Sequence, residues 1–506
     1  MGGVVAAVES KPEHVDVLVV GAGLSGIGAA CHLSRECPGK SLTILEARES
    51  MGGTWDLFRY PGIRSDSDMF TLGYDFRPWE EAEAIADGPS ILRYVKETAR
   101  EYGVDETVRY GHRVVRADWS SEDALWRVQA HRAGGDPVEL TCSFLYGCTG
   151  YYRYDKGYLP EFEGVERFQG TVAHPQHWPK ELDYSGKRVV VIGSGATAVT
   201  LVPAMAGRAE HVTMLQRSPS YIVSLPNVDP LAERAQRRLS ANAAYSLVRW
   251  KNVLLQLGFF NLSRKAPKLV RRLIRNGLVR QLPAGYEVDV HFNPRYNPWD
   301  QRLCLVPDGD LFEAVGRGDA SIVTDGIETF TEKGVKLSSG EELEADIIVT
   351  ATGLTLLVMG DIEVSVDGDE VTVCDRVGYK GMMLSGVPNM ALTLGYTNAS
   401  WTLKADLVAH YVCRLLRHMD ERGYAIAMPQ PPDPSIPTEP FIDLKSGYVL
   451  RSLHELPKQG AVAPWRLHQN YFRDIAMLKR GPLDDAMEFS PAQTGEAGAL
   501  PDAVAA

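Results

Sequence analysis

A glycine-rich turn between a short apolar run and a helical stretch occurs twice in this chain. The first copy follows the apolar run Val15 to Val20 and reads GAGLSG, with Gly21, Gly23 and Gly26 at GxGxxG spacing. A strand, a tight turn and a helix in this order create an anion site at the helix N-terminus, which suits a pyrophosphate. Glu46 ends the next apolar run and is suited to accept hydrogen bonds from a ribose diol. The pattern predicts a dinucleotide-binding α/β domain.

The second copy follows a second expected buried strand, Lys187 to Ile192, and reads GSGATA, with Gly193, Gly195 and Ala198 at the same spacing. Its second strand ends at Arg217, with no acid. An arginine there can bind a ribose 2′-phosphate, which an acid would repel. We therefore expect a nucleotide with an unphosphorylated ribose at the first site and NADPH at the second. Alternatively, Arg217 is simply a solvated charge at the end of a strand.

Two similar strand-and-turn segments bracket the second copy: Phe144 to Gly150 (FLYGCTG) and Ile347 to Gly353 (IIVTATG). They indicate where the chain leaves and re-enters the first domain. We expect an α/β fold of two Rossmann-like dinucleotide-binding domains, the second inserted in the first. Residues 14–150 and 354–488 would form the first dinucleotide-binding domain and 151–353 the second, NADPH-binding domain, with residues 1–13 and 489–506 as disordered tails.

A basic helical insertion is expected at about 228–283. Between Leu231 and Leu282 the chain has twelve Lys or Arg residues and one acid, Glu233, interleaved with apolar residues and Trp250 at helical spacing. Solvated helices packed over the domain interface are one interpretation, and a surface for anionic lipid or a partner is the other. The six prolines of Pro429 to Pro440 predict an extended loop.

Composition excludes several classes of protein. Apolar residues make up 44% and charged residues 23%, as in folded soluble proteins, and the net charge of −12 argues against a nucleic-acid partner. Seven scattered cysteines without a CxxC pair indicate neither a disulfide framework nor a zinc site, so we expect no metal and a cytoplasmic location. No apolar run reaches the ~20 residues of a membrane span.

Two nucleotide sites of different ribose preference imply electron transfer between NADPH and a tightly held flavin. A disulfide reductase would need a cysteine pair against the flavin. Cys31 and Cys37 lie on the first helix or just past its end, and their spacing makes them point in different directions. The leading hypothesis is hydride transfer to flavin followed by oxygen activation, with one oxygen atom going to a substrate.

Two longer motifs carry a resemblance to a known family. Gly52 to Asp66 (GGTWDLFRYPGIRSD) fits [A/G]GxWxxxx[F/Y]PGxxxD, and Phe168 to Pro179 (FQGTVAHPQHWP) fits FxGxxxHxxxW[P/D]. These are the fingerprints of type I Baeyer-Villiger monooxygenases. The chain from about Val15 to Arg480 is similar to their mycobacterial ethionamide-activating subgroup, including YNPWDQRLCLVP and GYTNASWTLKADL. Related flavin-containing monooxygenases usually end the second motif in Phe or Tyr, so Trp178 favours the Baeyer-Villiger branch.

The resemblance implies roles for individual residues. FAD would be bound by Gly21, Gly23, Ser25, Gly26, Glu46, Gly53, Thr54, Trp55, Arg64, Asp66 and, through its main chain, Val114. NADPH would be bound by Gly193, Ser194, Gly195, Thr197, Ala198, Arg217 and Ser218. His174 and Trp178 would couple nicotinamide binding to domain rotation, and ordinary interdomain packing is the alternative for both. The family's layout places the pocket walls at Tyr60, 398–404 and 445–465.

Arg302, in DQRLCL, aligns with the family's active-site arginine. A guanidinium cannot give up its proton at neutral pH, so it would stabilise a deprotonated C4a-peroxyflavin and the anionic adduct that follows. Asp66 would orient that guanidinium. Alternatively, Asp66 only caps a turn of the backbone. Many relatives have a lysine at the position of Gln301, so NADPH preference here would depend mainly on Arg217 and be looser.

The implied function is an NADPH- and O₂-dependent flavin monooxygenase that converts ketones to esters or lactones. Oxidation of sulfides or thioamides by the same machinery is an open extension. A flavin-containing monooxygenase acting mainly on sulfur or nitrogen, a non-catalytic NADPH redox sensor and an oxidase that makes only peroxide are the alternatives. The expected partners are O₂ and a small ketone or sulfide, with peripheral membrane contact through the basic insertion as a further option; the oligomeric state is left open.

Overall fold

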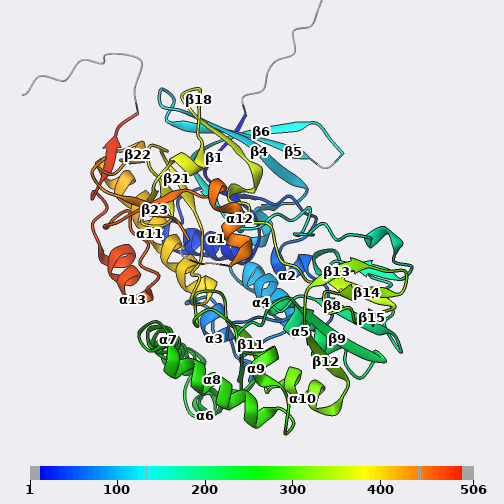
Figure 1. The fold of residues 1–506 in the computed structure, drawn as a ribbon. Helices are drawn as coiled ribbons and strands as arrows, with labels where there is room; N and C mark the ends of the chain where they lie inside the picture. Colours follow the sequence, from blue (N-terminus) through cyan, green and yellow to red (C-terminus); the bar gives the residue numbers. More distant parts are fainter. Residues whose placement is uncertain (1–11, 133, 443, 445, 493–506) are drawn as a thin grey trace, which may run out of the picture.

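Two sheets built on parallel strands form the framework of the computed structural model, which describes residues 12–132, 134–442, 444 and 446–492 (Figure 1). The larger sheet has nine strands. Its order is β18 (Asp369–Glu370), β17 (Glu363–Val366), β4 (His112–Ser120), β5 (Leu125–Arg132), β6 (Pro137–Gly147), β1 (Glu13–Val20), β2 (Leu42–Leu45) and β3 (Val108–Arg109), with β21 (Met390–Leu392) also paired to β6.

The second sheet has five strands, all parallel. Its order is β12 (Ala320–Thr324), β9 (His211–Gln216), β8 (Arg188–Ile192), β16 (Ile347–Thr350) and β7 (Thr171–Ala173). Strands β1 and β8 are each buried on two faces, with helices packed on one face and other strands on the opposite face. Val17, Leu18 and Val19 are fully buried in this way.

Helices cover the sheets and line the space between them. On the larger sheet α1 (Leu24–Glu36) packs against α11 (Trp401–Arg422) and α4 (Gly88–Glu101). On the smaller sheet α5 (Ala196–Met205) packs against α10 (Asp310–Arg317). The remaining helices are α2 (Thr54–Leu57), α3 (Met69–Leu72), α6 (Pro230–Gln236), α7 (Ala241–Lys265), α8 (Pro267–Gln281), α9 (Val288–His291), α12 (Gly447–Ser452) and α13 (Tyr471–Asp474).

Short strand pairs complete the fold. Strands β10 (Ile222–Leu225) and β11 (Cys304–Pro307) are parallel and lie just before and after the helical insertion in the chain. The others are β13 (Ile327–Phe330), β14 (Gly334–Leu337) and β15 (Glu342–Glu344), β19 (Gly378–Tyr379) and β20 (Met383–Leu384), β22 (Ile426–Pro429) and β25 (Met487–Ser490), and β23 (Thr438–Pro440) and β24 (Lys458–Gly460).

The predicted α/β class is confirmed. The strands of the nine-stranded sheet come from segments before and after the five-stranded sheet in the sequence. Helices α6 to α8 occupy the predicted basic insertion. The proposed domain boundaries at 151 and 353 stay a prediction. Strands extend into both predicted tails, since β1 begins at Glu13 and β25 ends at Ser490. The rest of those tails, residues 1–11 and 493–506, lies outside the described residues.

Seven free cysteines are described. Six are buried and Cys374 alone is partly exposed. None of the helices in the described part of the chain combines the length and the apolar content that a membrane span needs.

Candidate active site

A cavity of about 1070 Å³ lies between the two sheets and is open to both glycine-rich loops. The turns after β1 and β8 form part of its wall, as do the two segments in which the chain crosses between the sheets. The crossing segments contribute Thr149 to Tyr152 on one side and Ala351 to Leu354 on the other. The cavity therefore lies at the carboxyl ends of the parallel strands β1 and β8, which is the usual place for a nucleotide in such sheets.

The first glycine loop is packed so closely at Gly21 and Gly26 that neither position can accommodate a side chain. Gly21 has a φ of 103°, and a Cβ there would lie 2.5 Å from the carbonyl oxygen of Cys148. A Cβ on Gly26 would lie 1.8 Å from the carbonyl oxygen of Gly21. A Cβ on Gly23 would lie 3.5 Å from the Cα of Gly53 in the next loop, which is an ordinary contact distance. The N-terminus of α1 is therefore bare backbone that a pyrophosphate can approach, as FAD requires.

Glu46 follows β2 and lines the same end of the cavity. Its Oε2 accepts a hydrogen bond from the N–H of Ala22 over 2.8 Å, and its Oε1 accepts one from the N–H of Arg48 over 2.9 Å. Burial raises the pKa of Glu46, although both backbone hydrogen bonds favour the charged form. These contacts hold the carboxylate at the loop, where its remaining lone pairs can accept ribose hydroxyls.

The second glycine loop has the same tight turn but a more open helix start. Gly193 has a φ of 142°, and a Cβ there would lie 2.3 Å from the carbonyl oxygen of Ala351. A Cβ on Gly195 would meet no atom within 4 Å. Arg217 and Ser218 follow β9, are exposed and line the cavity. This loop is suited to a second dinucleotide, with a free guanidinium at its ribose end.

Arg302 and Asp66 meet in the cavity although 236 residues separate them. The Nε of Arg302 donates to Oδ2 of Asp66 over 3.0 Å, and Nη2 lies 2.7 Å from the same oxygen. The negative charge of Asp66 raises the pKa of Arg302 against the opposing effect of burial, so the guanidinium stays charged. Trp299, in the segment before Arg302, has a φ of 68°, which is strained for an aromatic residue.

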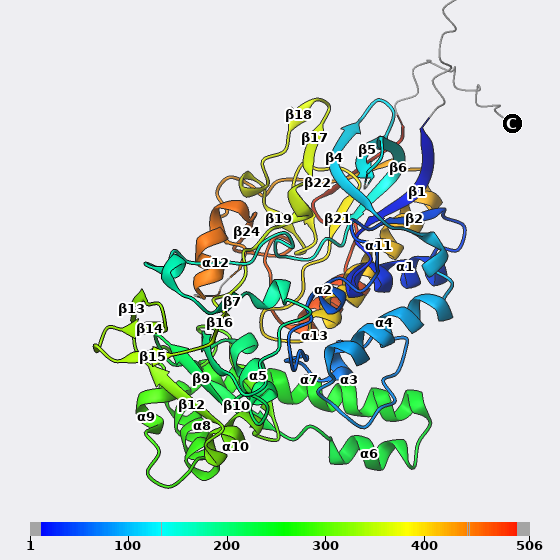
Figure 2. The same ribbon diagram turned by 90° about the vertical axis from the view of Figure 1, so that its right-hand side faces the viewer.

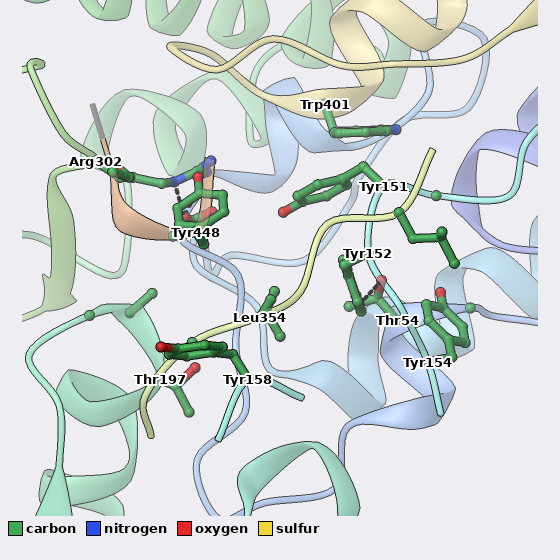
Figure 3. Close-up of a pocket in the computed structure, with 18 of the residues that line it drawn as sticks. Thr54, Tyr151, Tyr152, Tyr154, Tyr158, Thr197, Arg302, Leu354, Trp401 and Tyr448 are labelled. Carbon is green, nitrogen blue, oxygen red and sulfur yellow. Dashed lines mark hydrogen bonds and ion pairs between the residues drawn. The ribbon is translucent and has the colours of Figure 1, made fainter. Parts of the chain in front are cut away.

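Aromatic side chains form the wall between the two loops (Figure 3). The rings of Tyr151 and Trp401 stack with centroids 4.9 Å apart, and the indole N–H of Trp401 donates to Oγ of Ser25 over 2.7 Å. Tyr448, from α12, lies beside Arg302 in the figure. Burial raises the pKa of Tyr448, so its hydroxyl keeps its proton. The wall is thus apolar with a few fixed hydroxyl groups.

The structure brings most of the predicted residues to this cavity. Its lining includes Gly21, Gly23, Ser25, Glu46, Gly53, Thr54, Trp55, Asp66, Val114, Gly193, Ser194, Gly195, Thr197, Arg217, Ser218 and Arg302. Gly26 and Ala198 are buried outside this lining, and Gly26 packs directly against the turn at Gly21. Whether each residue binds the nucleotide assigned to it stays a prediction.

Other predicted residues lie away from the cavity lining. The guanidinium of Arg64 pairs with Asp310 of α10 instead. His174 and Trp178 flank the turn after β7, and burial lowers the pKa of His174. Their role in domain coupling stays a prediction. Tyr60 was expected in the pocket wall but is buried against α5.

Sequence reasoning missed the tyrosines of the first crossing segment. Tyr151, Tyr152, Tyr154 and Tyr158 all line the cavity, and the hydroxyl of Tyr152 donates to Oγ1 of Thr54 over 2.5 Å. Their clustering directly after the CTG turn was the available signal. The segments expected at 398–404 and 445–465 contribute only in part, through Ala399, Trp401, Ser446 to Tyr448 and Arg451.

Comparison with known proteins decides the family. The model of the flavin-binding monooxygenase-like family matches residues 14–229. The FAD-containing monooxygenase EthA of Mycobacterium tuberculosis is 58% identical over 476 residues, which cover 94% of this chain and 97% of that protein. The chain belongs to the type I Baeyer-Villiger monooxygenases, in the EthA subgroup. It is therefore a flavin-dependent monooxygenase.

A second relative agrees with this family, and a solved structure agrees with the fold. The probable FAD-binding monooxygenase AlmA of Acinetobacter baylyi is 48% identical over 477 residues, covering 94% of this chain and 96% of that protein. The solved structure of an oxidized steroid monooxygenase bound to NADP superimposes with a TM-score of 0.74 at 23% identity, covering 94% of this chain and 99% of that one. The expected fold of two Rossmann-like domains is thereby confirmed.

Proposed function

We propose that this enzyme uses FAD, NADPH and O₂ to insert an oxygen atom into ketones, giving esters or lactones. We propose sulfides and thioamides as a second substrate class for the same site. The observation that carries the proposal is the Arg302–Asp66 pair in a cavity that both nucleotide loops share. A redox sensor would have no use for a charged arginine at that place.

The residues present fit both cofactors. The bare backbone at Gly21, Gly23 and Gly26 and the carboxylate of Glu46 would hold FAD. The open helix start at Gly195 and the guanidinium of Arg217 would hold NADPH. Bound FAD, once reduced by NADPH, supplies the electrons that activate O₂.

Arg302 would stabilise negative charge on oxygen during the reaction. A guanidinium has five N–H groups, and Asp66 engages only those on Nε and Nη2. The Nη1 group has no hydrogen-bond partner among the described residues and remains available to an anionic oxygen in the cavity. Asp66 would fix the plane of the guanidinium through two contacts to one oxygen, so that little reorganisation is needed when charge develops.

The aromatic wall would keep water away from that charge. Tyr151 stacks on Trp401, and Tyr448 lies beside Arg302 (Figure 3). Electrostatic stabilisation by Arg302 is stronger where bulk water is excluded, because the local dielectric constant is lower. The same wall offers an apolar surface to the carbon skeleton of a substrate.

The test compares Arg302→Ala with Arg295→Ala, which removes an exposed arginine seven positions away. Both proteins are saturated with FAD, and NADPH oxidation and product are measured with panels of ketones and sulfides. We expect Arg302→Ala to lose roughly 100- to 1,000-fold in product formation while it still binds flavin. Arg295→Ala should match the wild type.

Two results would refute the proposal. The first is product formation in Arg302→Ala equal to that of the control. The second is a wild-type enzyme that oxidises NADPH without making product from either panel, which would indicate an oxidase. The pH dependence of the two rates separates the substrate classes, because attack on a carbonyl needs a deprotonated oxidant and oxidation of sulfur needs a protonated one.

A further inference from the structure

The outer face of α7 carries large apolar side chains in contact with solvent. Leu247, Trp250, Leu254, Leu255 and Leu262 are between 39% and 63% exposed. They follow one another at intervals of three, four, one and seven residues, which places them on one broad face of the helix. A surface helix of a soluble protein normally turns such a face inward.

The apolar face continues onto α8. Leu269, Leu273 and Val279 are about half exposed there. Phe472, the second residue of α13, is 41% exposed, and its ring stacks on that of Trp250 with centroids 5.8 Å apart. Figures 1 and 2 both show α6, α7 and α8 along one edge of the molecule, away from strands β4 to β6. We call the exposed residues of α7 and α8 the docking face.

Exposed basic residues without ion partners lie on the same two helices. Within the described part of the chain, Lys265, Lys268, Arg272 and Arg280 are exposed and form no ion pair. Other basic residues of these helices are neutralised, by pairs such as Lys251–Asp229, Arg264–Asp300 and Arg275–Asp289. The docking face therefore keeps a positive charge in a chain whose net charge is −12.

We propose that the docking face binds the surface of an anionic phospholipid bilayer. Leucines and a tryptophan that enter the headgroup region, with lysines and arginines at the same level, are the combination that holds an amphipathic helix in the plane of a membrane. A second copy of the chain is a poorer occupant, because two such faces would bring uncompensated positive charges together. Nucleic acid would leave the leucines in water.

The inner face of α7 connects the docking face to the cavity. Asn252 and Gln256 donate to the carboxylate of Asp68 over 2.7 and 2.8 Å, two residues from Asp66. The ring of Phe260 contacts that of Trp299, with centroids 5.6 Å apart, in the segment before Arg302. Docking would therefore hold the arginine side of the cavity close to the lipid surface. The proposal itself does not depend on which substrate is oxidised.

The test uses FAD-loaded full-length protein and sedimentation with vesicles. We expect binding to phosphatidylcholine vesicles that contain phosphatidylglycerol, weak binding to phosphatidylcholine alone, and loss of binding at high salt because the charge attraction is screened. Leu255→Ser should weaken binding to the anionic vesicles by about tenfold, since one leucine no longer leaves water. The matched control is Leu159→Ser, which removes a leucine of similar exposure outside the docking face.

A second pair of variants tests the charge. Lys265→Gln/Lys268→Gln should weaken binding at low salt and reduce its salt dependence, whereas Lys180→Gln/Lys333→Gln should not, because these exposed lysines lie elsewhere. The proposal is wrong if phosphatidylglycerol does not increase binding, or if the control substitutions weaken it equally. It is also wrong if the protein forms a dimer that Leu255→Ser disrupts and binds no vesicles. NADPH oxidation without vesicles should be the same in all four variants.

Discussion

Replacing His32 with Gln should remove a pH-dependent part of the protein's stability. His32 lies on α1 and is fully buried. Its Nδ1 is 3.1 Å from Oε1 of Glu36, and its Nε2 is 3.3 Å from Oδ1 of Asp406. Burial alone would lower the pKa of His32, but hydrogen bonds to Asp406 and Glu36 outweigh it and raise the pKa to about 9.

The size and sign of the effect follow from this shift. An unfolded histidine has a pKa of about 6.5, so the difference is roughly 2.5 units, or about 3 kcal/mol at about 1.4 kcal/mol per unit. Because the folded pKa is the higher one, this stability is fully present below about pH 6.5 and is lost as the pH rises towards 9. The neighbouring His410, whose pKa is also raised, changes stability in the same direction.

The measurement is urea unfolding of FAD-saturated protein at about pH 6, 7.5 and 9. Between about pH 6 and about pH 9 the free energy of unfolding should fall in both proteins. The fall should be larger in the wild type than in His32→Gln, by roughly 3 kcal/mol. His454→Gln, at an exposed histidine on the surface, should keep the wild-type slope. Equal slopes for wild type and His32→Gln would refute the reasoning, because the buried ring would then be neutral and carry no second proton.

Three further predictions concern the cavity. Asp66→Asn should lower the rate of product formation roughly 10- to 100-fold, since the guanidinium of Arg302 loses its charged partner, and steady-state rates check it. Arg217→Gln should raise KM for NADPH roughly tenfold and leave KM for NADH unchanged; equal effects on both would show that Arg217 does not bind the 2′-phosphate. Gly26→Ala should yield protein without flavin, because its Cβ would lie 1.8 Å from a carbonyl oxygen, whereas Gly39→Ala, where no atom lies within 4 Å, should purify yellow.

The parts of the site that depend on local sequence could be predicted from the residues alone. The turns at Gly21 and Gly193 and the acid at Glu46 are defined by a few consecutive residues between a strand and a helix, so spacing is enough to place them. The crossings after Gly147 and Thr350 were visible for the same reason, as repeated strand ends.

Contacts between distant segments could not be predicted in this way. Arg302 and Asp66 were paired only through the family resemblance, because nothing local to DQRLCL indicates a carboxylate 236 residues earlier. Trp401 reaches Ser25 across 376 residues, and no periodicity predicts such a contact. Tyr60 was misplaced because its motif specifies the backbone turn and not which side of it the ring occupies. Such positions follow from how α11 and α5 pack, which is a property of the whole chain.

The burial of the cysteines has a practical consequence for physical studies of this enzyme. Cys374 is the one partly exposed thiol, and burial raises the pKa of the thiols of Cys31, Cys148 and Cys304 to about 12. A maleimide dye must reach the thiol to react with it, so labelling of the native, unmutated protein should be confined to Cys374. The wild-type enzyme can thus carry a single fluorophore near β18, from which energy transfer to labelled lipid would report how the molecule is oriented.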